Sequence, residues 1–204
     1  KALQEGVRLR DRDLPHCPPT DHVPLYNPIE EYLYNTGRWD GKDRIRPLAC
    51  LVPCHNPHWR ELFYRWFLGM VAHWRGIDKQ HGNNTSPLLV GPQGYRKSTF
   101  CRILLPPELR FGYTDSIDFK SKQEAERSLG RFFLINIDEF DQINANQQGF
   151  LKHLLQKPVA NLRKPYGSTI QEMRRNASFL GTSNLNDLPT DPTRNRQSHS
   201  FASK

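Results

Sequence analysis

The most regular hydrophobic pattern in the chain follows Asn56-Pro57, a typical start signal for a helix. Eight apolar side chains recur there at the spacing of one face of an α-helix. They are Trp59, Leu62, Phe63, Trp66, Phe67, Met70, Val71 and Trp74. Such an aromatic stripe can bind a partner helix or stack bases, but its regularity favours a helix that packs into a core.

A shorter helix is predicted near residue 28, because Asn27-Pro28 combines an N-cap side chain with a proline at the first helical position. Three apolar side chains then share one face before Gly37. Residues 1–25 mix charges with four prolines and show no apolar period, so we expect an extended leader there. We assign residues 26–80 to a small helical subdomain.

After a polar break at residues 81–86 the pattern becomes that of short strands and helices. Three apolar runs typical of buried strands lie at 87–90, 132–137 and 179–182. Three helical stretches accompany them, at 97–105, 122–129 and 144–156. This arrangement predicts an α/β fold over 81–204, with a parallel sheet and flanking helices.

Composition excludes some classes of protein. The longest apolar runs, such as 132–135, are far shorter than the roughly 20 residues that a membrane span needs, so we expect no membrane association. The four cysteines among 204 residues are too scattered for a disulfide framework. We therefore expect free thiols and a cytoplasmic protein.

The charge of the chain is +8, and most of the excess lies in its C-terminal part. Within residues 152–175 six cations face a single acid, Glu172. The cations are Lys152, Lys157, Arg163, Lys164, Arg174 and Arg175. This cluster suits a phosphate backbone, and the alternative is a solvated basic face.

A phosphate-binding loop is predicted between the first strand and the first helix of the α/β region. The segment from Gly91 to Ser98 reads Gly-Pro-Gln-Gly-Tyr-Arg-Lys-Ser and fits G-x-x-x-x-G-K-[ST], except that Arg96 replaces the second glycine. Backbone N–H groups in such a loop face a triphosphate, Lys97 reaches the outer phosphates and the Ser98 hydroxyl reaches Mg²⁺. The alternative is a turn that only resembles this motif.

Polar side chains follow two of the predicted strands. Asp138-Glu139 ends the run 132–137, where Asp138 would hold Mg²⁺ and Glu139 would deprotonate the attacking water. Asn184 follows the run 179–182 and either contacts the γ-phosphate or the water, or forms a simple turn. Downstream, Arg194 and Arg196 are candidate arginine fingers.

Seven motifs in this order resemble the virulence-associated E (VapE) family over roughly residues 26–196. They are Asn27-Pro28-Ile29 through Trp39-Asp40-Gly41-Lys42-Asp43-Arg44-Ile45, Gly91 through Thr99, Tyr113-Thr114-Asp115-Ser116, Ile137-Asp138-Glu139, Arg163-Lys164-Pro165-Tyr166-Gly167, Gly181-Thr182-Ser183-Asn184 and Asp191-Pro192-Thr193. The family is similar to superfamily 3 helicases and primase-associated helicases of bacterial phages and mobile elements. The resemblance implies an AAA+/superfamily 3-like P-loop NTPase and ATP-driven work on DNA during replication of such an element.

The resemblance also implies residue roles and partners. ATP and Mg²⁺ would be held by Gly91, Gly94, Arg96, Lys97, Ser98 and Thr99, together with Asp138. A β-hairpin would present Arg163, Lys164 and Tyr166 to single-stranded or forked DNA. Arg196 would complete the site of a neighbouring subunit in a homo-oligomeric ring, and a primase domain is a further expected partner.

The chain departs from the family pattern in three ways. Arg96 and Arg194 stand where the family has glycine, and Gln197 replaces its second arginine after Asn195. A further strand normally follows the residue at which this chain ends, so we expect the ATPase domain to be truncated at its C-terminus. These departures leave a second hypothesis open, a nucleic-acid-binding module with a degenerate, non-hydrolysing P-loop.

A third hypothesis is a zinc site. The spacing Cys-x3-Cys-His-x2-His offers Cys50, Cys54, His55 and His58 as ligands. The direct adjacency of Cys54 and His55 makes joint tetrahedral coordination awkward, so this hypothesis ranks below the other two.

Overall fold

A five-stranded parallel sheet forms the centre of the computed structural model, which describes residues 26–77, 80–163, 170–184 and 200–202. The strand order is β2-β3-β6-β1-β7. The strands are β1 (Leu88–Val90), β2 (Tyr113–Thr114), β3 (Leu134–Ile137), β6 (Ser178–Ser183) and β7 (Ser200–Ala202). The predicted α/β fold with a parallel sheet is confirmed, and the predicted leader lies outside the described residues.

The three strands predicted to carry the site are neighbours in this sheet. β6 lies between β3 and β1, with Ile137 opposite Gly181 and Val90 opposite Ser183. The sequence that follows each strand therefore emerges at the same edge of the sheet. β7 pairs in parallel with β1 on its other side. The expected truncation of the ATPase domain at its C-terminus stays a prediction.

Eight helical segments surround the sheet within the described residues. They are α1 (Pro28–Asn35), α2 (Ile45–Ala49), α3 (Trp59–Arg75), α4 (Lys97–Ile103), α5 (Lys122–Arg131) and α6 (Ala145–Gln156), with the 3-10 turns η2 (Pro107–Gly112) and η3 (Phe140–Gln142). The Asn27 side chain caps α1 as predicted, accepting from the amide nitrogens of Ile29 and Glu30. In this part of the chain no helix combines the length and the apolarity needed to span a bilayer.

The helix α3 begins two residues later than its start signal indicates. The Asn56 side-chain oxygen accepts a hydrogen bond from the His58 amide at 2.8 Å, which closes a turn before the helix. The aromatic stripe then packs into the core as predicted, with Phe63, Trp66 and Met70 almost fully buried. The Trp66 indole nitrogen donates to the Phe179 carbonyl at 3.0 Å and so ties α3 to β6.

Two hydrophobic clusters cover opposite faces of the sheet. Leu134 and Leu180 belong to the cluster that also contains the buried side chains of α1, α3 and α4. Their neighbours Ile135 and Phe179 belong to the cluster formed with α5 and α6. Successive side chains of a strand point to opposite faces, so each cluster fills one side. The helices at 26–77 therefore share a hydrophobic cluster with β1 and α4, and the division at residue 80 stays a prediction.

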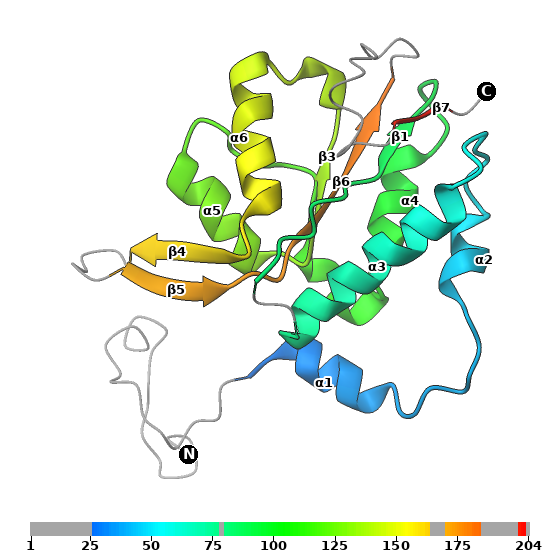
Figure 1. The fold of residues 1–204 in the computed structure, drawn as a ribbon, viewed down its shortest axis with the longest axis horizontal. Coiled ribbons are helices and arrows are strands. Elements are labelled where there is room, and N and C mark those ends of the chain that lie inside the picture. The colour runs from blue at the N-terminus through cyan, green and yellow to red at the C-terminus, as the bar shows by residue number, and fades with distance from the viewer. Residues whose placement is uncertain (1–25, 78–79, 164–169, 185–199, 203–204) are drawn as a thin grey trace, which may run out of the picture.

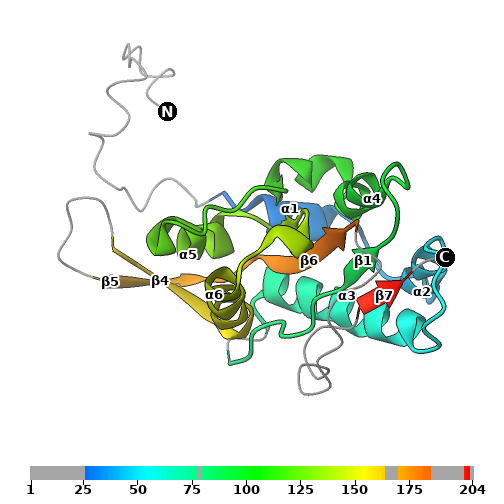
Figure 2. The ribbon, with the colours of Figure 1, turned by 90° about the horizontal axis from the view of Figure 1, so that it is seen from above.

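The predicted hairpin forms a separate two-stranded antiparallel sheet of β4 (Val159–Arg163) and β5 (Ile170–Arg174). It projects from one end of the molecule, whereas α2 and β7 lie at the other end (Figures 1 and 2). The predicted tip, residues 164–168, lies outside the described part of the chain.

Candidate nucleotide-binding site

The loop between β1 and α4 has the backbone conformation of a tight turn. The Gly91 amide donates to the Ser183 carbonyl at 3.2 Å, which joins the start of the loop to the end of β6. Gly94 and Arg96 both have positive φ, 89° and 55°. Arg96 thus lies at a left-handed position, where a residue with a Cβ costs about 1 to 2 kcal/mol. The Arg96 side chain itself is exposed.

Lys97 connects the loop with the end of β6. Its ammonium donates to the carbonyls of Gly91 at 2.6 Å and Pro92 at 2.9 Å. It also donates to the Asn184 side-chain oxygen at 2.9 Å. Two features predicted separately from the sequence, the P-loop lysine and the asparagine at the strand end, are thus in direct contact.

Ser98 and Asp138 also meet at this edge of the sheet. The Ser98 hydroxyl lies 3.3 and 3.4 Å from the two carboxylate oxygens of Asp138. The Thr182 hydroxyl donates to the same carboxylate from β6. A hydroxyl and a carboxylate in contact are hard oxygen ligands of the kind that Mg²⁺ takes beside a phosphate. The donor set, with the Lys97 ammonium next to it, fits Mg·ATP.

Glu139 follows Asp138 in an unusual backbone conformation. Its φ is 50° and its ψ is 50°, one of two positive-φ non-glycine residues in the described chain. Such conformations store strain and cluster at functional sites. The Glu139 side chain is exposed and accepts no hydrogen bond from a described residue. Its side chain therefore faces solvent.

Three polar residues at this edge did not enter the predicted site. Thr182 and Ser183 are each 1 % exposed at the end of β6. Ser183 donates to the Asp141 carboxylate at 2.7 Å. Burial alone raises the pKa of Asp141, but this hydrogen bond and backbone amides bring it below its ordinary value. A signal existed in the sequence, since Asp141 follows the acidic pair closely and Thr182-Ser183 are polar residues in an otherwise apolar run.

The remaining predicted residues are not brought into this site. Thr99 is exposed on α4. Arg163 lies on β4, and its side chain is outside the description. Lys164, Tyr166, Arg194 and Arg196 lie outside the described residues. Their roles stay predictions.

The basic cluster predicted over residues 152–175 is smaller than its sequence indicates. The Lys157 ammonium pairs with Glu126 at 2.6 Å, and both side chains are largely buried. Arg174 donates to the carbonyls of His73 and Trp74 at the end of α3. These two cations therefore serve internal contacts.

Arg175 is a third cation of the predicted cluster that does not lie at the surface, because it is 1 % exposed. Its guanidinium donates to the carbonyls of Leu154, Leu155 and Lys157 at the end of α6, at 2.6 to 3.0 Å. It also donates to the Ala177 carbonyl at 2.8 Å. Burial lowers the pKa of Arg175 to about 10, which still leaves it charged at neutral pH. It therefore supplies hydrogen bonds to carbonyls at the end of α6, where a helix lacks intrahelical donors for its last carbonyls.

The zinc hypothesis is not supported. In the described ranges no three His, Cys, Asp or Glu side chains gather in a metal-binding group. Cys50, Cys54 and Cys101 are free thiols, and Cys54 accepts a hydrogen bond from the Asn56 amide at 3.4 Å.

Comparison with solved structures gives the same fold. Two structures of the NrS-1 C terminal region match with TM-scores of 0.50 and 0.51, each at 12% sequence identity over 78% of this chain. A third apo structure of that region matches with a TM-score of 0.50 at 14% identity over 77% of this chain. The matched part is 36% or 37% of those longer chains. No curated protein matches the sequence.

The profile of one protein family matches most of the sequence. The virulence-associated protein E-like domain aligns with residues 33–199, which contain every residue of the site described above. The resemblance inferred from the motifs is confirmed, and the chain belongs to the virulence-associated protein E-like domain family.

Proposed function

We propose that this protein is an ATP-dependent DNA-processing motor, a helicase-like ATPase that acts in replication of a phage or mobile genetic element. The observation that carries the proposal is the convergence of Lys97, Asp138 and Asn184. Lys97 contacts Asn184 at 2.9 Å, and Ser98 contacts Asp138 at 3.3 Å. These residues come from the three loops that follow β1, β3 and β6, and their donor set fits Mg·ATP.

Each side chain of the site has a distinct proposed role. Bound Mg²⁺ would neutralise charge that develops on the phosphates. Ser98 and Asp138 supply the oxygen ligands, and Thr182 orients the Asp138 carboxylate. Lys97 donates to the outer phosphate oxygens in place of its present carbonyl partners. Glu139 accepts a proton from the attacking water at its carboxylate, while Asn184 positions that water.

The proposed DNA contact and assembly rest on the family resemblance and on the hairpin. The strands β4 and β5 support the expectation that Arg163, Lys164 and Tyr166 reach single-stranded or forked DNA. Arg196 is proposed as the finger that a neighbouring subunit contributes in a homo-oligomeric ring. A primase domain stays a proposed partner.

One observation favours the second candidate function, a nucleic-acid-binding module that does not hydrolyse ATP. Arg96 occupies a left-handed position in the loop with its φ at 55°, where the motif has glycine. A large side chain there can restrict the approach of the phosphates to the backbone amides.

Steady-state ATP hydrolysis, measured with and without single-stranded DNA, tests the choice between these functions. We expect turnover that DNA stimulates, and we expect Glu139→Gln to lower it by a factor of about 10² to 10⁴ while ATP still binds. Glu108→Gln changes an exposed carboxylate on η2 and serves as the matched control. Hydrolysis that Glu139→Gln leaves unchanged would overturn the assigned base. A parent protein that binds ATP and DNA without turnover would favour the second function.

A further inference from the structure

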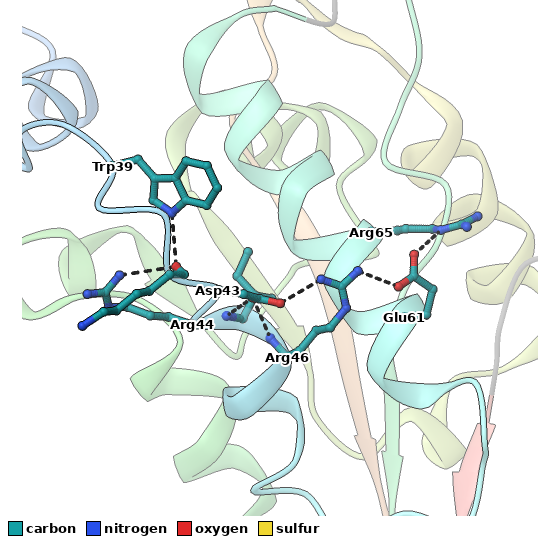
Figure 3. Close-up of polar contacts among 8 residues, drawn as sticks. Trp39, Asp43, Arg44, Arg46, Glu61 and Arg65 are labelled. Carbon is teal, nitrogen blue, oxygen red and sulfur yellow. Dashed lines mark hydrogen bonds and ion pairs between the residues drawn. The ribbon is translucent and has the colours of Figure 1, made fainter.

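The segment between α1 and α2 forms a rigid turn that carries an exposed indole. Both terminal guanidinium nitrogens of Arg44 donate to the Asp40 carboxylate, at 2.7 and 2.6 Å. The same carboxylate accepts from the Lys42 amide at 3.1 Å. The Trp39 indole nitrogen donates to the Lys42 carbonyl at 3.1 Å, so the turn fixes the ring (Figure 3).

A series of ion pairs anchors this turn to α3. Asp43 accepts from the amides of Ile45 and Arg46 and so caps α2. The Arg46 guanidinium bridges Asp43 and Glu61, each at 2.8 Å, and Glu61 also accepts from Arg65 at 3.0 Å (Figure 3). Hydrogen bonds from Arg46 hold the pKa of Asp43 below its ordinary value. The orientation of the indole is therefore built into the fold.

Trp39 differs from the other three tryptophans in its exposure. It is 79 % exposed, whereas Trp59, Trp66 and Trp74 are at most 3 % exposed. A large aromatic ring held in solvent by hydrogen bonds gains nothing from core packing. Rings of this kind are enriched where proteins bind partners, because little conformational freedom is lost on binding.

The charges next to Trp39 indicate the chemistry of the partner. Asp40 and Asp43 are each paired with an arginine. Arg38 and Lys42, which lie on either side of Trp39 in the sequence, are exposed and form no ion pair within the described residues. The turn therefore presents an aromatic face next to two uncompensated cations. A stacked base with its flanking phosphates satisfies both features, whereas a purely apolar protein pocket would leave the cations without partners.

We propose that the Trp39 turn is a second contact site for single-stranded nucleic acid. One base stacks on the indole, and Arg38 and Lys42 contact the adjacent phosphates. The turn leads into α2, at the end of the molecule opposite the β4–β5 hairpin (Figures 1 and 2). It is therefore reached by a different stretch of the strand. This inference rests on the proposed function only in taking single-stranded nucleic acid as the ligand.

Tryptophan fluorescence of the whole chain during titration with a thymidine oligonucleotide tests this site directly. Since Trp39 is the exposed member of the four tryptophans, base stacking should quench its emission. Trp39→Ala should weaken affinity by roughly fivefold or more, as expected for a lost base stack. Phe111→Ala, which removes another exposed ring, should leave affinity unchanged.

Two further sets of variants separate stacking and charge from a structural role. Trp39→Phe keeps an aromatic face but loses the indole hydrogen bond, and it should retain most of the affinity. Arg38→Gln and Lys42→Gln should each reduce the salt slope of binding by about one unit, whereas Arg60→Gln, at an exposed position on α3, should not.

The titration contains no ATP, so failure of the proposed ATPase activity does not affect it. The proposed site would be overturned if Trp39→Ala bound the oligonucleotide as tightly as the parent and if the oligonucleotide did not quench the tryptophan emission of the parent. Equal losses of affinity in Trp39→Phe and Trp39→Ala would show that the indole only stabilises the turn, and this result would also overturn the proposed site. Quenching that rises with protein concentration in the absence of nucleic acid would instead identify a second copy of the chain as the partner.

Discussion

The edge of the sheet where β1, β3 and β6 end and the basic segment at 152–175 differ in how well the sequence predicted their structure. At this edge of the sheet, residues from three separate segments converge, and Lys97 contacts Asn184 across 87 positions of sequence. In the basic segment, by contrast, cations that are adjacent in the sequence bind different elements of the fold. Arg174 binds the end of α3, and Arg175 binds the end of α6.

The two regions differ because a polar residue at a strand end has a fixed place in the fold, whereas a run of cations does not. A polar residue directly after a buried strand has its place fixed by the sheet, because the carboxyl ends of parallel strands share one edge. A run of cations fixes no such place. Helix C-termini carry carbonyls without partners, and an arginine can satisfy several of them from inside the protein. Counting charges therefore overestimates the surface that is available to a polyanion.

The largest expected effect concerns the stability that Arg175 provides. Arg175→Ala removes the donor to buried carbonyls at the end of α6 and should lower the free energy of unfolding by about 1 to 3 kcal/mol. Urea denaturation measures this loss. Lys152→Ala removes an exposed cation of the same segment and should change stability by about 0.5 kcal/mol or less. Similar small losses for both variants would show that Arg175 is not a structural cation.

A smaller effect is expected at Arg96, where the loop between β1 and α4 departs from the phosphate-loop motif that the sequence predicts. Arg96→Gly relieves a left-handed conformation and should raise the free energy of unfolding by about 0.5 to 1 kcal/mol, with ATP turnover equal to or above that of the parent. Arg102→Gly, within the helix α4, should instead cost about 1 kcal/mol. A large loss of turnover in Arg96→Gly would identify Arg96 as a phosphate ligand.

Long periodic segments and strand ends were the predictable parts of this molecule. The stripe of α3 follows from its helical period, and the capped start of α1 follows from the pair Asn27-Pro28. The helix α6 begins within one residue of the stretch predicted at 144–156. The helix α2 has five residues and contains Pro47, and β2 has two residues, so neither is long enough to show a period. Tertiary packing places both.

The site residues that could be predicted from the sequence are those in a recognisable motif or directly after a buried strand. Lys97 follows β1 and Asp138 directly follows β3, so the sheet fixes where both residues lie. In the structure Lys97 contacts Asn184, and its neighbour Ser98 contacts Asp138. The supporting contacts of Thr182 and Ser183 depend on which strand lies beside which, information that the apolar run of β6 does not contain. The internal role of Arg175 likewise depends on where α6 ends.

The affinity of the protein for a fluorescent ATP analogue with Mg²⁺ tests the central claim most directly. Lys97→Ala should weaken binding by roughly 10- to 150-fold, as expected when a charged donor to the phosphates is lost. Lys120→Ala, at an exposed lysine outside the site, serves as the control and should bind like the parent. Equal affinities of Lys97→Ala and the parent would contradict the assignment of this loop as the ATP site.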